Sequence, residues 1–526
     1  MKKGIFKKLF IFTMPFLFVF GLASCSSEEE KPSEVKEEIK EYIVSFDTDG
    51  DIKSSTVLEN GLVEEPLAPT KNKYTFLGWY LGDTKFDFNT KITSDITLHA
   101  KWRSNSAITL NRLGSSETYD VETEFKASYF INPSNVFSKD LARFAFNLAA
   151  INYGDERVSK FFNALDFDNI FMIKENDSAY DGVSYSFAHK KIDDTDYIAV
   201  SIRGMRYYEE WAGNFDIGGS GNHKDFEKCA NIVYSSLKDY YNRYNYSSNA
   251  KVIMSGYSRS AAISNVLADK IMKDTTKLVE NDNLYVYTYE APNCLDINNV
   301  IAYPNVFNFI NSGDMVVNLP PTLFGFGRCG IDIDIYNPNM SSIVKEFDDS
   351  YIIPEFKKLI GNDVSNDQEL PIKFIENLTD YNANPNSETY QEDLTYEIDT
   401  REKYFNNLSP TIQYLFNFAF DTKTETLDKM IAGIINIFKT DTTRGISLFT
   451  NGDNLHDFVA SYLNRDNIRY DDQKLYDASN KIVGTLSRNA SIMLFAYANS
   501  SNLTRMGLMH SPLVAYILMS YYLNNN

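Results

Sequence analysis

Cysteine and histidine are scarce in this chain, which limits the metal chemistry it can support. Its 526 residues include four cysteines and five histidines. No two cysteines form a Cys-x-x-Cys pair and the histidines do not cluster with them, whereas structural zinc sites are built from such closely spaced ligands. We therefore expect no metal site and no other cofactor. The spacing leaves open one disulfide among Cys229, Cys294 and Cys329.

Positive charge is also in short supply. Lysine and arginine together number 51 against 71 acidic residues, so the formal net charge is −20. Binding to nucleic acid or to anionic lipid requires a basic surface, and we expect neither a nucleic-acid partner nor broad attraction to anionic lipid. The 35 tyrosines, 37 phenylalanines and 43% hydrophobic content are typical of a globular protein, and the length exceeds one ordinary domain.

Apolar runs approaching membrane-spanning length are missing beyond the N-terminus. Four lysines among the first eight residues precede the apolar run Leu9–Leu22, which fits a secretory signal. The run ends in Leu-Ala-Ser-Cys at residues 22–25, which resembles a bacterial lipobox. The resemblance implies a signal peptide over residues 1–24 and a diacylglyceryl group on Cys25. It therefore predicts a lipoprotein at the extracellular face of the bacterial cell membrane; the alternative is an ordinary signal peptide with an incidental cysteine.

Short aromatic strands follow a serine- and glutamate-rich segment, residues 25–41, that we interpret as a flexible tether. The strands expected at Tyr42–Phe46, Tyr74–Tyr80 and Ile96–Trp102 are separated by turn signals. The motifs VSFDTDG, YTFLGWY and ITLHAKW resemble the Listeria–Bacteroides repeat of the internalin B-repeat type. For residues 42–103, the resemblance implies a small β-grasp-like stalk or adhesive module with a cell-surface partner and no catalytic residues.

The segment Lys251–Ala262, KVIMSGYSRSAA, carries the main catalytic signal of the remaining chain. A short apolar strand enters a Gly-x-Ser-x-Ser turn, and an alanine-rich segment with helical periodicity leaves it. This order places Ser258 on a sharp bend, with the first amides of the helix pointing into the same space. α/β-Hydrolases present their nucleophile in this way, although Ser260 stands where a glycine is usual. The alternative is an ordinary strand-to-helix turn.

The residues upstream of this turn resemble class 3 lipases and their bacterial relatives. The strand DYIAVSI leads into Arg-Gly-Met at residues 203–205, and a Glu-Trp-x-x-Asn-Phe-Asp motif and His223 follow. The resemblance implies that the backbone amides of Met205 and Arg259 bind the oxyanion. Family members commonly have Thr or Ser at the position of Met205, so a side-chain donor is lost while the backbone donor is kept. His223 is either a neighbour of this oxyanion loop or a structural hydrogen-bonding residue.

Asp314 is the candidate for the acid of a catalytic triad. It follows the expected strand Asn305–Ile310 in the sequence NSGDMVVNLPP, and class 3 lipases carry an aspartate in the corresponding motif. The order Ser, Asp, His along the chain is also the order found in α/β-hydrolases. A surface aspartate in a turn is the alternative interpretation.

Two histidines that follow Asp314 in the chain compete for the role of base. His510 lies in a loop before a final apolar helix, which is the arrangement in class 3 lipases, and we favour it. His456 is expected at the start of a helix, where an exposed or capping role is the ordinary explanation. The histidine matters because a serine hydroxyl is a weak nucleophile until a neighbouring base removes its proton.

A large helical insertion is expected between the acid and the base, at about residues 340–500. Apolar residues between Leu427 and Phe438 recur at helical spacing, and Thr411–Phe420 is a second apolar helix. The insertion is either a cap, or lid, that offers an apolar groove to acyl chains, or a helical subdomain packed only for stability.

These observations predict a lipase-like α/β-hydrolase domain over residues 126–526, joined by a linker over residues 104–125 to the β-rich module. The expected activity is that of a lipid-anchored serine carboxylic ester hydrolase acting on acyl esters through Ser258, His510 and Asp314. The alternative is a surface adhesin or binding lipoprotein with an inactive hydrolase fold. The departures at Met205 and Ser260 favour that alternative.

Overall fold

The computed structural model describes residues 40–111, 118–151, 155–174, 177–204, 210, 213–314, 316–339, 342–343, 429–430, 433, 436–437, 440–487 and 509–526. Contacts between residues divide the chain into two compact units. The first comprises residues 1–67 and 78–100, and the second comprises residues 68–77 and 101–526. The signal peptide, Cys25 and the tether as far as residue 39 lie outside the described residues, and the last tether residue, Glu41, begins strand β1 (Glu41–Asp47).

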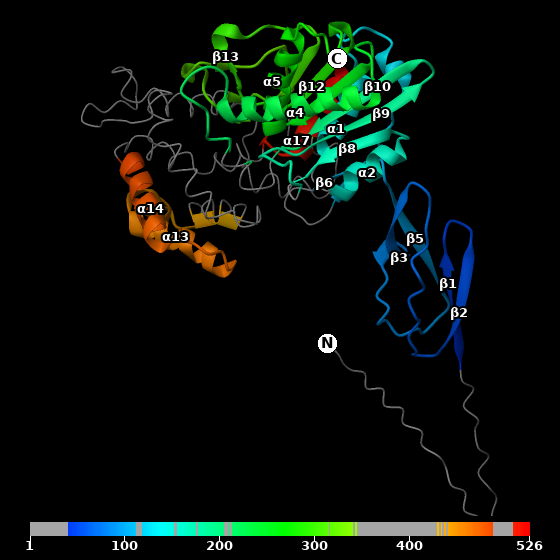
Figure 1. The fold of residues 1–526 in the computed structure, drawn as a ribbon. Helices are drawn as coiled ribbons and strands as arrows, with labels where there is room; N and C mark the ends of the chain where they lie inside the picture. The colour runs from blue at the N-terminus through cyan, green and yellow to red at the C-terminus, as the bar shows by residue number, and fades with distance from the viewer. Residues whose placement is uncertain are drawn as a thin grey trace, which may run out of the picture. The chain divides into compact units, whose positions relative to one another are not determined.

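The N-terminal module is built on a five-stranded sheet in the order β2-β1-β5-β3-β4 (Figure 1). Strands β1 and β2 form an antiparallel hairpin, and β1 pairs in parallel with β5. Phe46 and Trp79 are buried in its core. Their ring centroids lie 5.0 Å apart in an edge-to-face arrangement, which is one that aromatic pairs prefer. The predicted β-rich module is confirmed, with strands β1 (Glu41–Asp47), β2 (Ile52–Leu58), β3 (Tyr74–Leu81), β4 (Thr84–Lys85) and β5 (Ile96–Ser104).

The turn between β1 and β2 depends on its aspartates and glycine. Asp49 and Gly50 have φ angles of 64° and 109°, which are conformations that Asp and Gly tolerate best. The Gly50 amide donates a hydrogen bond to Oδ1 of Asp47 over 2.7 Å. The carboxylate of Asp47 thus satisfies a backbone donor of the turn.

The second unit is organised around a seven-stranded sheet in the order β16-β14-β12-β11-β10-β9-β8. The neighbouring strands β16, β14, β12, β11 and β10 pair in parallel. Strand β9 pairs antiparallel with both β10 and β8. Apolar runs such as that of β11 are typical of strands covered on both faces. The strands are β8 (Asp168–Ile173), β9 (Tyr185–Ile192), β10 (Thr195–Ile202), β11 (Lys251–Tyr257), β12 (Leu284–Tyr289), β14 (Val306–Ile310) and β16 (Ile331–Asp334).

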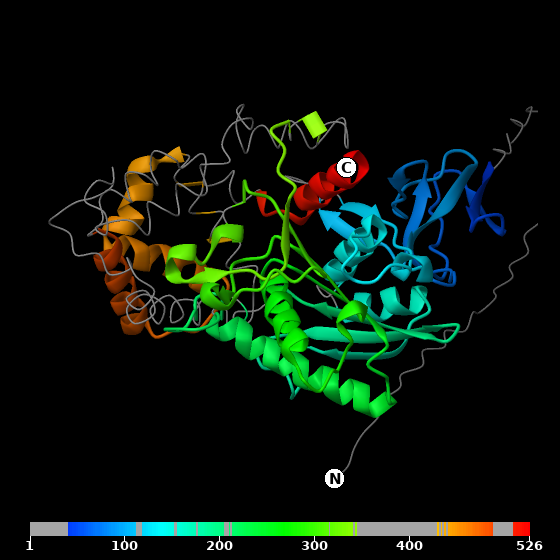
Figure 2. The same ribbon diagram turned by 90° about the horizontal axis from the view of Figure 1, so that it is seen from above.

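Helices cover both faces of this sheet, as seen from above in Figure 2. Helices α1 (Lys139–Ala150) and α17 (Pro512–Asn525) share one buried cluster with Tyr285, Tyr287 and Tyr289 of β12. Helices α4 (Lys224–Tyr244) and α5 (Arg259–Lys273) share the other cluster with Leu284 and Val286 of the same strand. Successive side chains of a strand point to opposite faces, so β12 serves both cores. The predicted lipase-like α/β-hydrolase architecture is confirmed.

Shorter elements connect the main ones. The segment expected as a linker holds a hairpin of β6 and β7, and Ile108 and Leu110 of β6 are buried in the cluster shared by α1 and α17. The other elements here are β6 (Ile108–Asn111), β7 (Thr118–Val121), α2 (Asp155–Ala164), β13 (Leu295–Asp296), β15 (Phe326–Gly327) and the 3-10 helices Ala127–Phe130, Asn281–Asn283, Ile297–Asn299, Val316–Asn318 and Thr322–Phe324.

Three helices are described in the region of the predicted insertion: α12 (Thr442–Thr450), α13 (Gly452–Arg465) and α14 (Asp472–Ser487). Asn451 caps α13, because its side chain accepts the amides of Asp453 and Asn454. The expected helix at Thr411–Phe420 lies outside the described residues, as does most of the stripe from Leu427 to Phe438. Whether the insertion acts as a lid stays a hypothesis.

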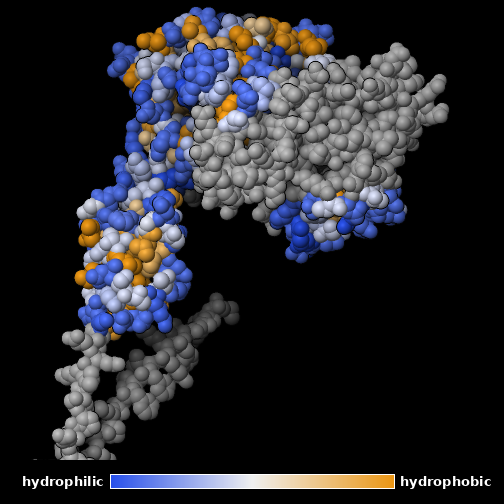
Figure 3. All heavy atoms as spheres, turned by 180° about the vertical axis from the view of Figure 1, so that it is seen from behind, coloured by the Kyte–Doolittle hydropathy of each residue, from blue (hydrophilic) through white to orange (hydrophobic). Residues whose placement is uncertain are grey.

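The surface of the described residues is mixed in polarity (Figure 3). Ile43, Ile52, Leu58 and Leu62 of the N-terminal module are exposed, and orange atoms lie scattered among hydrophilic ones there. Isolated apolar side chains of this kind are normal on folded domains. No helix in the described part of the chain combines the length and apolar character needed to cross a membrane.

Candidate active site

Ser258 occupies the single residue between strand β11 and helix α5. Its φ of 58° and ψ of −127° are uncommon for a residue with a side chain. The Ser258 amide donates to the carbonyl of Tyr289 over 2.9 Å, and its own carbonyl accepts the amide of Ala261 over 2.8 Å. A strained backbone conformation of this kind persists only where the surroundings hold it in place. Here the neighbouring strand and the following helix do so.

The close approach of strand and helix explains Gly256. A Cβ atom at this position would lie 2.4 Å from the carbonyl carbon of Ser260, so the turn has no room for a side chain there. Ser260, which departs from the usual glycine, is accommodated by local hydrogen bonds. Its Oγ accepts the amide of Tyr257 and donates to the carbonyl of the same residue, both over 2.8 Å. The serine thus closes the turn without entering the site.

Three sequence-predicted residues meet at the C-terminal edge of the sheet. Nε2 of His510 lies 2.7 Å from Oγ of Ser258, and Nδ1 of His510 lies 2.5 Å from Oδ2 of Asp314. Ser258 and Asp314 are buried, and the side chain of His510 is 18% exposed. The imidazole therefore bridges a hydroxyl and a carboxyl group and keeps one edge accessible. This is the geometry in which a histidine activates a serine.

Backbone contacts fix the orientation of this trio. Oδ1 of Asp314 accepts the amide of Val316 over 2.9 Å, which leaves Oδ2 for the imidazole. The hydroxyl of Tyr257 donates to the carbonyl of His510 over 2.8 Å. His510 lies immediately before the C-terminal helix α17, which packs on the sheet through its apolar residues. The loop that carries the imidazole is thus tied to the residue preceding the nucleophile.

His456, the competing base, is engaged elsewhere. It lies in helix α13, where its Nδ1 is 3.0 Å from Oδ1 of Asp457 and its Nε2 is 3.1 Å from Oδ1 of Asp472. Burial lowers the pKa of His456, but the two carboxylates outweigh burial and raise it overall. Both ring nitrogens therefore have acidic partners, and the structure joins His510 rather than His456 to Ser258.

Only part of the predicted oxyanion site is described. Met205 lies outside the described residues. Arg203, two residues earlier, donates from Nε and Nη2 to Oε1 of Glu210 over 3.1 and 2.8 Å, and both side chains are almost fully buried. This ion pair joins Arg203 and Glu210, which lie on either side of Met205 in the sequence. Arg259 is the first residue of helix α5, where a backbone amide has no acceptor within the helix.

The side chain of Arg259 is buried beneath the turn. Its guanidinium donates to Oδ2 of Asp225 over 2.5 Å and to Oδ1 of Asn214 over 3.1 Å. Burial alone lowers the pKa of Arg259, but the negative charge of Asp225 more than offsets this and raises it. The arginine therefore stays charged and links the nucleophile turn to α4 and to the segment around Asn214.

His223 packs with the residues around the Arg259 side chain and not against Ser258. Its Nε2 lies 3.2 Å from the carbonyl oxygen of Asn214, and its ring stacks on Phe226 at a centroid distance of 3.7 Å. The guanidinium of Arg259 also lies over the ring of Phe226. His223 thus packs next to residues that contact Arg259, and no described contact joins it to Ser258.

The described cysteines lie outside the trio. Cys229, Cys294 and Cys329 are buried free thiols, and burial raises the pKa of Cys229 to about 12. No cluster of three or more His, Cys, Asp or Glu residues that could hold a metal ion occurs in the part of the chain described.

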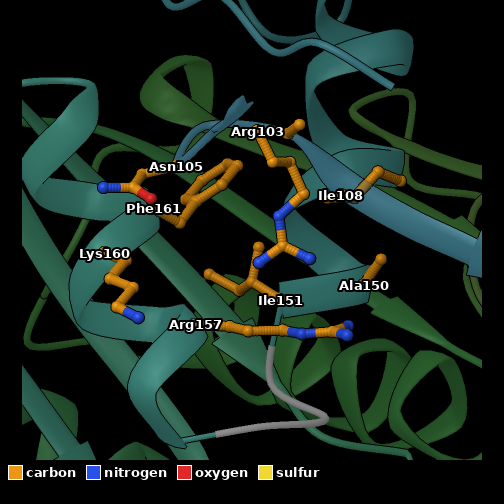
Figure 4. A pocket seen from close by; sticks show the side chains of 9 residues that line it. Arg103, Asn105, Ile108, Ala150, Ile151, Arg157, Lys160 and Phe161 are labelled. Atoms are coloured by element: carbon orange, nitrogen blue, oxygen red, sulfur yellow. The ribbon is translucent and has the colours of Figure 1, made fainter. Parts of the chain in front are cut away.

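A cavity of about 20 Å³, close to the space for one water molecule, is lined by residues that include Arg103, Arg157 and Phe161 (Figure 4). The cavity is too small for an acyl ester. It includes none of the residues of the trio.

Sequence reasoning missed two residues next to the trio, Tyr257 and Glu290. Glu290 follows strand β12 directly and is completely buried, its carboxyl group accepts the amide of Asn311, and the negative charge of Asp314 acts on it. In the sequence, a glutamate after a strand and before Ala-Pro has the character of an exposed turn. The burial of Glu290 follows from the packing of β12 beside β14, which local sequence does not show.

Comparisons with known proteins assign families to two segments. Residues 42–101 match the family described as the Listeria-Bacteroides repeat domain, and residues 199–324 match the family described as Lipase (class 3). Over 70 residues, the chain is 50% identical to Internalin H of Listeria monocytogenes, covering 12% of this chain and 13% of that protein. The chain spans between 11% and 15% of the length of this relative and of two putative membrane proteins of Evansella cellulosilytica that it also matches.

Solved lipase structures also resemble the chain, at low identity. One, described as a triacylglycerol lipase whose catalytic centre is a serine protease triad, is 19% identical, with 39% of this chain and 83% of that chain covered and a TM-score of 0.30. The lipase of Rhizopus microsporus var. chinensis is 17% identical, with 43% and 82% covered and a TM-score of 0.27. The family matches themselves identify a Listeria–Bacteroides repeat domain and, over residues 199–324, a class 3 lipase domain, which supports a serine ester hydrolase.

Proposed function

We propose that this chain hydrolyses acyl esters, with Ser258 as nucleophile, His510 as base and Asp314 as the acid that orients it. The observation that supports the proposal most strongly is the imidazole of His510, placed 2.7 Å from Oγ of Ser258 and 2.5 Å from Oδ2 of Asp314. Each ring nitrogen of His510 thus has the partner that nucleophilic catalysis needs. The class 3 lipase match over residues 199–324 supports an ester as the substrate.

In the acylation step, Oγ of Ser258 attacks the carbonyl carbon of the ester while its proton moves to Nε2 of His510. The carboxylate of Asp314 stabilises the resulting imidazolium and keeps Nδ1 as its hydrogen-bond donor. When the tetrahedral intermediate collapses, the bond to the leaving alcohol breaks and the alcohol takes the proton from Nε2. An acyl group then remains on Ser258.

Backbone amides supply the stabilisation of the negative oxygen in this step. The amide of Arg259 starts helix α5, next to the nucleophile, where the helix dipole also favours negative charge. We assign the second donor to Met205, which lies in the sequence between the buried ion-pair partners Arg203 and Glu210. Donors placed in advance are effective because they need no reorganisation during the reaction.

Deacylation repeats these steps with water as the nucleophile. Nε2 of His510 removes a proton from the water, the oxygen attacks the acyl carbon, and the bond to Oγ of Ser258 breaks. The proton returns to Oγ and the carboxylic acid leaves. The steps use groups of this chain, the ester and one water molecule.

We further propose that the enzyme is a lipoprotein held by a lipid on Cys25 at the extracellular face of the membrane. The Leu-Ala-Ser-Cys sequence after an apolar run and four lysines supports this location. Its test is metabolic labelling with a clickable fatty acid in a bacterial host. Label on the wild type and not on Cys25→Ala is the expected result, and equal label on both contradicts the anchor.

The hydrolase proposal is tested with p-nitrophenyl esters of rising acyl length. We expect turnover by the wild type and none above background by Ser258→Ala. Turnover that increases with acyl length supports a lipase, and turnover confined to the shortest esters indicates a short-chain esterase. A folded wild type without turnover of any ester favours the alternative, a surface adhesin or binding lipoprotein with an inactive hydrolase fold.

A further inference from the structure

A second carboxyl group lies buried against the proposed triad. Glu290 is the first residue after strand β12, and its side chain is completely buried. Its φ of 52° is uncommon for a residue with a long side chain, and its amide donates to the carbonyl of Phe309 over 2.8 Å. Uncommon backbone conformations of this kind cluster at functional sites, where the surrounding structure maintains them.

The hydrogen bonds of Glu290 leave one carboxyl oxygen without a donor. Oε2 accepts the amide of Asn311 over 3.0 Å. Oε1 is buried and receives no hydrogen bond within the described part of the chain. The carbonyl of Asn311 also accepts the amide of Asp314 over 2.8 Å, so both acidic residues bond the same turn, and the negative charge of Asp314 acts on Glu290. A buried carboxylate oxygen without a donor is costly, whereas a proton held between Glu290 and Asp314 would turn one of their oxygens into a donor.

The contacts of Asp314 indicate which group holds that proton. Its Oδ1 accepts the amide of Val316, and its Oδ2 lies 2.5 Å from Nδ1 of His510. Both oxygens of Asp314 therefore already have hydrogen-bond partners. Glu290 has one such donor, the amide of Asn311, and no cationic side chain in hydrogen-bonding contact among the described residues.

Other charged groups near Glu290 do not compensate a second negative charge. Asp334 adds negative charge and accepts the amides of Ser312 and Tyr336. Arg328 donates to the carbonyl of Ala291, but its guanidinium forms a salt bridge with Asp332 over 2.8 Å. Burial first, and the charge of Asp314 second, raise the pKa of Glu290 well above its ordinary value, against the smaller lowering by the Asn311 amide.

We propose that Glu290 remains protonated at neutral pH and donates a hydrogen bond to the carboxylate of Asp314. The proposal rests on the proposed hydrolase function and makes Glu290 a positioning residue for it. Asp314 then receives three hydrogen bonds, from His510, Val316 and Glu290. The imidazole faces a single negative charge that is held in one orientation. An ionised Glu290 would add a second negative charge behind the imidazole, which would favour its protonated form and so suppress its function as a base.

The first test compares two variants of similar size. In Glu290→Gln the amide group donates to Asp314 and its oxygen accepts from Asn311, so we expect kcat within about threefold of wild type. In Glu290→Leu the donor is lost, and we expect kcat to fall roughly 10- to 100-fold with little change in KM. Because Gln replaces a neutral group, the acid limb of its pH–rate profile should not move. A shift of that limb by about one pH unit or more would show that Glu290 is ionised in the wild type.

Equal kcat in Glu290→Gln and Glu290→Leu would also overturn the proposal, because it would assign Glu290 only a space-filling role. If Glu290→Leu does not fold, Glu290→Gln and a spectroscopic measurement decide the question. Infrared difference spectra are recorded at neutral pH on the full chain carrying Ser258→Ala, with and without Glu290→Gln.

We expect the carbonyl stretch of a protonated carboxylic acid in the single variant and its loss in the double variant. Absence of that band contradicts the proposal. Because this measurement does not require hydrolysis, it separates a failure of the Glu290 proposal from a failure of the proposed function. If the wild type has no esterase activity and the Ser258→Ala protein still shows the band, only the proposed activity is refuted.

Discussion

The phenol of Tyr257 donates a hydrogen bond to the backbone carbonyl of His510 over 2.8 Å. Tyr257 is the last residue of β11, and Ser258 follows it directly. The same turn that exposes the nucleophile therefore also holds the loop that carries the base, although 252 positions separate the two functional residues. The Tyr257 side chain, which is not part of the trio, therefore helps to position the imidazole of His510 next to Ser258.

Removal of that hydroxyl should loosen the base without changing the pocket for substrate. We expect Tyr257→Phe to lower kcat roughly 3- to 10-fold at nearly constant KM, because a net hydrogen bond contributes about 1 kcal/mol. Steady-state ester hydrolysis measures the effect. A matched control is Tyr285→Phe, which loses a 2.7 Å hydrogen bond to the carbonyl of Asn132 in the same sheet. An equal loss of kcat in both variants would contradict a specific role for Tyr257.

The choice between the two histidines leads to a second prediction. His510→Ala should lose at least about 1,000-fold in kcat, because Ser258 would lack its base. His456→Ala should retain wild-type activity, since its imidazole pairs with Asp457 and Asp472 in helix α13. Initial rates on one ester decide the matter, and circular dichroism confirms folding. An inactive, folded His456→Ala would show that the assignment of the base is wrong.

The tight packing of the turn leads to a third prediction, about stability. Gly256→Ala places a Cβ 2.4 Å from the carbonyl carbon of Ser260, and backbone has to shift to relieve the clash. We expect a loss of roughly 1–3 kcal/mol or more in the free energy of unfolding, measured by urea denaturation. At Gly219 a Cβ meets nothing within 4 Å, so Gly219→Ala is the control. Equal stability of the two variants would contradict the described packing.

A fourth prediction concerns pH and follows from the raised pKa of Glu290. Unfolded Glu290 ionises near its ordinary value of 4.5, whereas the folded protein retains the proton, so folding takes up a proton above that pH. The stability that this group contributes is therefore fully present below about pH 4.5 and decreases as pH rises toward the folded pKa. Glu290→Gln lacks this dependence.

Relative to wild type, Glu290→Gln should gain up to about 1.4 kcal/mol in unfolding free energy for each pH unit above about 5. Urea denaturation of both proteins at several pH values up to about 7.5 measures the difference. Parallel stability curves would mean that Glu290 ionises normally in the folded state. The variant is nearly isosteric, so packing contributes little to the comparison.

Much of the fold could be predicted from local pattern. The apolar runs of β10, β11 and β12 and the alternation in β1 and β5 are local properties, and the structure has strands at these places. The turn around Ser258 could be recognised because a strand, a Gly-x-Ser turn and a helix follow each other within twelve residues. Local pattern indicates only a linker over residues 104–125, because the burial of Ile108 and Leu110 of the antiparallel pair β6–β7 depends on distant helices.

The site could be predicted less completely, for a physical reason. The resemblance to class 3 lipases pointed to Asp314 and left His510 and His456 as competing bases, because spacing alone does not determine which distant loop returns to the serine. Glu290 was missed because a charged residue after a strand is ordinarily solvated. Its burial depends on the pairing of β12 with β14 and on the position of Asp314, which no local pattern encodes.

The most direct measurement of the central claim is covalent labelling of the full chain with a fluorophosphonate, followed by intact mass and peptide mapping. We predict one adduct per wild-type chain, located on Ser258, with labelling abolished in Ser258→Ala and strongly slowed in His510→Ala. His456→Ala should be labelled at the wild-type rate. A correctly folded wild-type protein that takes up no label, or takes it up at a residue other than Ser258, would contradict the account.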